Sequence, residues 1–159
     1  MKATNSKIIF VEQFFYPEGW LGAQIPRDIV SMIGEKISNV DVFCGDLPYI
    51  KDIDSNKNIF SRNTNVITIK LPFKPANKFI FKLINQIYFC ILFTIKIIKY
   101  QNISLIISQT NPPPIIIFIY LIASLKKLPY MIIAMDLYPD VFIKHYKKNY
   151  FKSIFKILE

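Results

Sequence analysis

Apolar and polar residues alternate in blocks along the chain, and their spacing predicts where strands and helices begin. The apolar run at 7–12 is short and a turn-rich segment follows it, which is typical of a buried parallel strand. Beyond it, four isoleucines recur every four residues and predict an amphipathic helix over about 23–37: Ile25, Ile29, Ile33 and Ile37. Because proline is tolerated in the first turn of a helix, Pro26 places the helix start close to Gly22.

The remaining blocks continue the same alternation. They predict strands at 40–44 and 65–71, a long helix at 76–99, a strand at 103–108, a helix at 113–126, a strand at 130–135 and a helix beginning near Tyr150. Strands that are apolar throughout and alternate with helices are typical of a parallel sheet covered on both faces. We therefore expect an α/β fold, a single Rossmann-like domain over residues 1–159.

Composition narrows the class of partner. The 20 basic and 11 acidic residues give a net charge of +9, which favours phospholipid headgroups, a diphosphate or nucleic acid. No recognised nucleic-acid motif accompanies the lysine-rich carboxy-terminal segment, so we expect no nucleic acid partner. Cys44 and Cys90 lie far apart without a metal-binding spacing, which fits a reduced cytosolic protein without a zinc site.

The long predicted helix is nearly apolar enough to cross a membrane. Lys82 and Lys96 leave only 83–95 uncharged, against the roughly 20 apolar residues that a span needs, so we expect it not to cross. Its outward stripe is interpreted as Lys78, Lys82, Asn85, Phe89, Phe93 and Lys96. Two aromatic residues within a basic face suggest interfacial membrane contact through Lys78, Lys82, Phe89, Phe93 and Lys96. The alternative is an ordinary core helix with a solvated face.

Ligands of such sheets bind outside the carboxyl ends of the strands, so the loops that follow the strands carry the candidate chemistry. In the loop at 14–22, Gly19 and Gly22 stand three residues apart before a helix, which lets backbone approach a ligand. The spacing differs from the dinucleotide-binding fingerprint. A tight turn into the helix is the alternative interpretation.

The loop at 109–114 places Asn111 where it could cap the next helix, ahead of three prolines. Prolines lack amide donors, so a rigid apolar wall with Gln109, Thr110 and Asn111 as polar contacts is expected rather than a phosphate cradle. The alternative is a stiff turn between strand and helix.

Asp136 follows a buried strand, with Asp140 four residues later. At the carboxyl end of a strand, Asp136 could act as a hydrogen-bond acceptor or a general base for a substrate hydroxyl. Helix capping, or pairing with Lys144 or Lys148, is the alternative.

Four segments, taken in order, carry a resemblance to a known family: IIFVEQFFYPEGWLGAQIPRDIVSMI, VDVFCGDLPY, the text leading into TNPPP, and PYMIIAMDLYPD. Together they resemble the amino-terminal domain of family-4 glycosyltransferases, most closely the bacterial branch that builds capsule and O-antigen polysaccharides. The resemblance spans essentially the whole chain. It implies a GT-B enzyme with two Rossmann-like domains facing across a cleft, of which this is the acceptor-side half.

The resemblance also implies roles for particular residues. The loop with Glu18, Gly19 and Gly22 would approach the donor diphosphate, and Gln109, Asn111 and Asp140 would contact substrate. Asp136 stands where many members of the family carry a histidine, and it is our candidate catalytic residue.

The implied partners are a nucleotide-sugar donor, a lipid-linked glycan acceptor and an anionic membrane surface. Cofactor and metal are expected to be absent. We expect a cytoplasmic protein, peripheral on the inner face of the cell membrane, whose missing donor-binding domain would be supplied by another domain or subunit. The alternative is a noncatalytic membrane-associated subunit or remnant that anchors a donor-binding partner.

Overall fold

The computed structural model describes residues 6–15, 21–36, 39–46, 63–73 and 79–135. They form five strands and three helices in the predicted order. The elements are β1 (Lys7–Val11), α1 (Leu21–Lys36), β2 (Asn39–Gly45), β3 (Thr64–Ile69), α2 (Phe79–Lys99), β4 (Ile103–Gln109), α3 (Ile115–Lys126) and β5 (Tyr130–Ile133).

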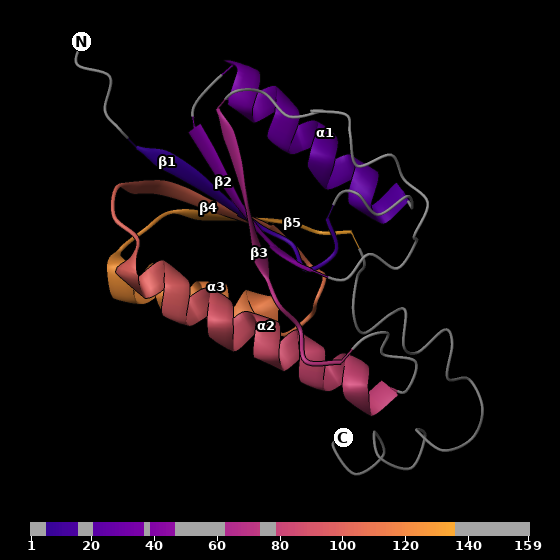
Figure 1. Ribbon diagram of the computed structural model, residues 1–159. Helices are drawn as coiled ribbons and strands as arrows, with labels where there is room; N and C mark the ends of the chain where they lie inside the picture. The colour runs from indigo at the N-terminus through magenta and orange to yellow at the C-terminus, as the bar shows by residue number, and fades with distance from the viewer. Residues whose placement is uncertain (1–5, 16–20, 37–38, 47–62, 74–78, 136–159) are drawn as a thin grey trace, which may run out of the picture.

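All five strands are parallel and form one sheet in the order β3-β2-β1-β4-β5 (Figure 1). The predicted Rossmann-like α/β arrangement is confirmed. From β1 the chain adds strands outward through β2 to β3, then returns along α2 to place β4 on the other side of β1. The strand order therefore reverses between β1 and β4, the position at which doubly wound sheets bind their ligands.

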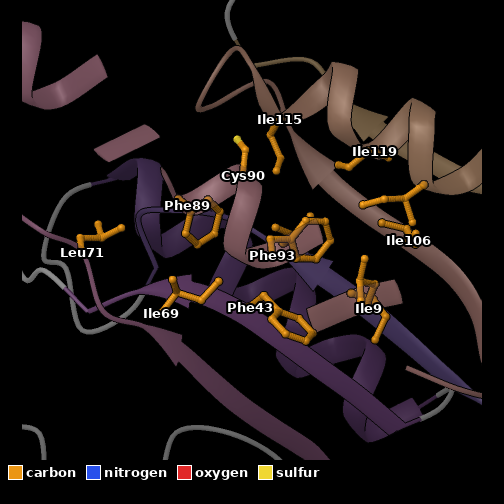
Figure 2. Close-up of a cluster of buried hydrophobic side chains, with 13 residues drawn as sticks. Ile9, Phe43, Ile69, Leu71, Phe89, Cys90, Phe93, Ile106, Ile115 and Ile119 are labelled. Atoms are coloured by element: carbon orange, nitrogen blue, oxygen red, sulfur yellow. The ribbon is translucent and has the colours of Figure 1, made fainter. Parts of the chain in front are cut away.

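Helices cover both faces of the sheet, α1 on one and α2 with α3 on the other (Figure 1). Beneath α1 lies a core that includes Phe10, Val30 and Val42. A larger core lies between α2, α3 and the opposite face (Figure 2). There the Phe93 ring meets the Phe43 ring edge-on at 5.4 Å between centroids, a favoured geometry for aromatic pairs.

The predicted outward face of α2 was wrong. Phe89 and Phe93, predicted to contact a membrane, are completely buried against the sheet, whereas Lys82 and Lys96 are exposed. The two rings supply the large volumes that fill the space below β1 and β2, and every isoleucine of the helix except Ile97 is exposed instead. Lys78 lies outside the described residues.

Asn85 is the polar member of this buried stripe, and its hydrogen bonds explain its place there. Its Oδ1 accepts from the backbone N–H of Phe73 at 3.2 Å, and its Nδ2 donates to the carbonyl of Phe73 at 3.0 Å. Both polar ends of the amide are satisfied by the segment that follows β3, so burial carries no unpaired group.

The buried side of α1 also differs from the predicted isoleucine stripe. Pro26, Val30, Ile33 and Gly34 face the core, while Ile25 is exposed. The helix begins at Leu21, so Pro26 stands beyond the first turn that was predicted for it. A proline at that position removes one hydrogen bond of the helix but places an apolar ring on the sheet.

The reversed face of α2 leads to a stability prediction. Replacing Phe93 with alanine should lower the free energy of unfolding by about 3–5 kcal/mol, because the ring is fully buried. Ile95→Ala, two residues away on the exposed side, should change it by no more than about 0.5 kcal/mol. Urea unfolding followed by circular dichroism measures both, and equal losses would contradict the assignment of the two faces.

Candidate functional site

Buried polar side chains gather where β1 and β4 end, beside the reversal of strand order. Glu12 and Gln13 follow β1, while Ser108, Gln109 and Thr110 close β4 and begin the next loop, and all five are buried. The register of β1 and β4 pairs Val11 with Ser108. Glu12 and Gln109 are the next residues after this pair. We call Glu12, Gln13, Gln109, Thr110 and Asn111 the carboxyl-edge cluster.

Backbone hydrogen bonds hold this edge in place. The N–H of Glu12 donates to the carbonyl of Phe43 at 3.0 Å, and the N–H of Gly45 donates to the carbonyl of Gln13 at 2.9 Å. From β4, the Ser108 hydroxyl donates to the carbonyl of Val11 at 2.9 Å. The polar side chains therefore stand on backbone fixed by three neighbouring strands.

Gly45 allows β2 to end close to Gln13. A Cβ at this position would stand 2.9 Å from the backbone oxygen of Gln13 and 3.0 Å from Cδ1 of Leu71, too near for any other residue without movement. The glycine is needed for space, since among the described glycines none has a positive φ. Its neighbour Asp46 accepts a hydrogen bond from the N–H of Leu71 at 2.8 Å, which ties down the end of β3.

Two buried amides at this edge keep hydrogen-bonding atoms free. Within the described part of the chain, Oε1 of Gln13 and Nε2 of Gln109 have no hydrogen-bond partner, although their side chains are almost completely buried. A buried donor or acceptor left without a partner costs roughly 1–3 kcal/mol. One atom is an acceptor and the other a donor, which is the pair that a hydroxyl group of a ligand can satisfy.

The loop after β4 is fixed at both ends. Thr110 donates its N–H to the carbonyl of Ile133 at 3.3 Å and accepts the N–H of Met135 at 3.2 Å on its hydroxyl oxygen. Asn111 is half-buried and precedes Pro112 through a cis peptide bond. The sequence places Asn111 where it could cap the next helix, but Pro114 occupies the cap position of α3 without a side-chain cap. The amide of Asn111 lies too far before the helix to serve as its cap.

The other predicted site residues are placed as follows. Gly22 is the second residue of α1. Glu18, Gly19, Asp136 and Asp140 lie outside the described residues. Of the residues predicted to bind substrate, the structure thus brings Gln109 and Asn111 to one edge.

Glu12, Gln13 and Gly45 belong to this edge, and sequence reasoning did not single them out as candidates. The signal that could have found the first two is the abrupt change from four buried apolar residues to two polar ones at the end of β1. The close approach of Gly45 to the backbone oxygen of Gln13 joins separate segments and leaves no local pattern.

At the opposite edge of the sheet, the charged side chain of Lys7 is paired within the protein. Lys7 Nζ lies 2.8 Å from Asp41 Oδ2 and 5.7 Å from the centroid of the Tyr100 ring. Burial raises the pKa of the Tyr100 hydroxyl, and the neighbouring Asp41 carboxylate adds to that effect. These contacts join β1, β2 and the segment between α2 and β4, so we interpret this group as structural. Within the described ranges, no three His, Cys, Asp or Glu side chains are grouped to hold a metal ion.

Comparison with known proteins supports the fold. No protein-family model and no curated protein matches the sequence. The fold is similar to two crystal structures of the C-terminal domain of PF1911 hydrogenase from Pyrococcus furiosus, covering residues 78–226 and 83–215 of that protein. The TM-scores are 0.58 and 0.56 at 12% identity, over 81% and 82% of this chain and 91% and 92% of those chains. At that identity the similarity shows the fold alone.

A weaker similarity is to a ugt transferase from Siraitia grosvenorii in complex with UDP. Its TM-score is 0.48 at 12% identity, over 80% of this chain and 27% of that chain.

The close approach at Gly45 predicts a penalty for any side chain there. Gly45→Ala should destabilise the fold by roughly 1–3 kcal/mol, because the new methyl group meets the fixed carbonyl of Gln13. Asn39→Ala, at the exposed start of the same strand, is the control and should change stability by about 0.5 kcal/mol or less. Thermal unfolding compares them, and a neutral Gly45→Ala variant would disprove the steric requirement.

Proposed function

We propose that this chain is the acceptor-side half of a GT-B glycosyltransferase that moves a sugar from a nucleotide-sugar donor to a lipid-linked glycan in cell-surface polysaccharide synthesis. The resemblance of its sequence motifs to family-4 glycosyltransferases supports the class. The structural observation that carries the proposal is the pair of buried amides, Gln13 and Gln109, whose free atoms stand at the reversal point of a parallel sheet.

The amides suit the binding of a sugar. Nε2 of Gln109 would donate to a hydroxyl oxygen of the acceptor, and Oε1 of Gln13 would accept the proton of a hydroxyl. Both groups are neutral, so they orient a hydroxyl without changing charge over the physiological pH range. A buried hydrogen-bonding site of this kind rejects molecules that lack the matching group, because its own polar atoms then stay unpaired.

The reaction forms a bond between the acceptor hydroxyl oxygen and the anomeric carbon of the donor sugar. The bond from that carbon to the donor phosphate breaks, and the nucleoside diphosphate leaves with the electron pair. The hydroxyl proton would pass to the departing phosphate, or to Asp136 as the candidate base. Asn111 and Asp140 would contact the acceptor, and the segment with Glu18, Gly19 and Gly22 would approach the diphosphate. This scheme requires no metal ion and no cofactor.

One Rossmann-like unit forms one wall of a GT-B cleft, so a donor-binding half is part of the proposal. It would come from a further domain or from a separate subunit. Sugar transfer catalysed by the purified 159-residue chain alone would contradict the half-enzyme assignment.

Gln109→Leu tests the binding role. Nanodiscs of phosphatidylcholine carry polyprenyl diphosphates that each bear one hexose or N-acetylhexosamine, and biolayer interferometry measures binding. The protein should bind nanodiscs that carry at least one of these lipids more strongly than it binds nanodiscs without sugar. The variant should weaken that binding about tenfold through loss of one hydrogen bond. It should not lower the melting temperature, because the replaced amide nitrogen has no partner in the fold.

Gln101→Leu is the matched control, since this exposed glutamine lies before β4 and outside the carboxyl-edge cluster. It should bind as the wild type does. Unchanged binding by Gln109→Leu, or no sugar-dependent binding by the wild type, would refute the acceptor role. Vesicle binding without any binding of sugar would instead favour the noncatalytic anchoring subunit.

A further inference from the structure

The outer side of α2 is a continuous apolar stripe. Six isoleucines lie three or four residues apart along it, each between 41% and 61% exposed: Ile80, Ile84, Ile87, Ile91, Ile95 and Ile98. This spacing puts them on one side of a helix, opposite the buried Phe89 and Phe93. A soluble helix usually presents polar residues at such positions.

α3 widens the stripe into a surface. It packs beside α2 on the same face of the sheet (Figure 1) and exposes five further large apolar residues: Ile116, Ile117, Tyr120, Leu121 and Leu125. We call these residues and the six isoleucines the α2/α3 apolar face. Single exposed apolar residues are ordinary, whereas a contiguous set over two adjacent helices marks an interaction surface.

The charge around this face has one sign. From residue 55 to residue 135 the chain has no Asp or Glu, yet it has ten basic residues: Lys57, Arg62, Lys70, Lys74, Lys78, Lys82, Lys96, Lys99, Lys126 and Lys127. On the two helices and just after them, Lys82, Lys96, Lys99 and Lys127 are exposed. An apolar surface bordered by lysines complements a bilayer with anionic headgroups.

The packing of α2 decides how it would meet a bilayer. Ile80–Lys99 is long and apolar enough to cross a membrane, but 28% of its most apolar window is buried within the fold. Phe89, Phe93 and Ile97 are fully buried in the core beneath the sheet, so crossing would expose the sheet. The helix can keep these contacts only by lying parallel to the membrane surface.

We propose that the α2/α3 apolar face docks on the surface of a lipid bilayer that contains anionic headgroups. A second copy of the chain fits this face less well, because it would bring the same lysines and no carboxylate from these helices to neutralise them. The aromatic and arginine anchors typical of protein interfaces are also scarce here, where isoleucine predominates. The proposal does not depend on sugar transfer.

Vesicle flotation of the full chain tests this proposal. Vesicles of phosphatidylcholine with about one-third phosphatidylglycerol should carry the protein upward, and vesicles of phosphatidylcholine alone should carry less of it. Ile87→Glu with Ile91→Glu should abolish flotation. The matched control, Ile25→Glu with Met32→Glu, changes similarly exposed residues of α1 on the opposite face of the sheet and should float normally. Lys96→Gln and Lys99→Gln should each lower partitioning about fivefold.

A site-specific probe supplies a second measurement. An environment-sensitive dye on Ile91→Cys should shift its emission to the blue when anionic vesicles are added, and the same dye on Met32→Cys should not. The native thiols of Cys44 and Cys90 are buried, and burial raises the pKa of Cys90 to about 12, so the introduced cysteine is the one that labels.

Three results would overturn the proposal: no flotation of the wild type, flotation unaffected by the Ile87→Glu and Ile91→Glu pair, or no blue shift at position 91. Sedimentation velocity can give a fourth such result. A dimer that dissociates when Ile87→Glu and Ile91→Glu are introduced would assign the face to a second copy of the chain.

Discussion

The pairing of β1 with both β2 and β4 is the contact on which the rest of the fold depends. It places β1, whose last four residues are buried and apolar, at the centre of the sheet, with both of its edges occupied by parallel neighbours. It also creates the reversal of strand order at which Gln13 and Gln109 come from different strands to one edge. The sheet hydrogen bonds that stabilise the core thus also determine which polar residues are neighbours at its end.

Much of this architecture can be predicted from the sequence, because the local pattern of apolar and turn residues indicates where strands and helices lie. Each strand lies within two residues of its predicted bounds, since a short apolar run between turn residues has few alternatives. The face of α2 could not be predicted in the same way. Both sides of that helix are apolar, so periodicity defines two stripes without choosing between them. Phe89 and Phe93 go inward because their volume fits the space beneath the sheet, which only the assembled fold defines.

The site follows the same division. Gln109 and Asn111 could be predicted as edge residues, because they end a strand whose carboxyl end must face the ligand side of a parallel sheet. The importance of Gln13 depends on its unpaired oxygen and on its contact with Gly45, which join residues far apart in the sequence. Likewise Asn85 looks misplaced on a buried stripe until its bonds to the backbone of Phe73 are seen.

Lys126, the last residue of α3, connects α3 to the end of α2. Its ammonium group donates to the carbonyls of Ile97, Ile98 and Tyr100 at 3.0, 2.8 and 2.6 Å, where α2 ends and its last carbonyls lack helical partners. An ammonium group has three donors, and here all three are used within the protein. Lys126 therefore joins the end of α3 to the end of α2 and is not a contact for lipid phosphate. Because Lys126 joins the ends of α2 and α3, any surface that contacts both helices also sets the tilt of the sheet and the height at which its carboxyl edge is presented.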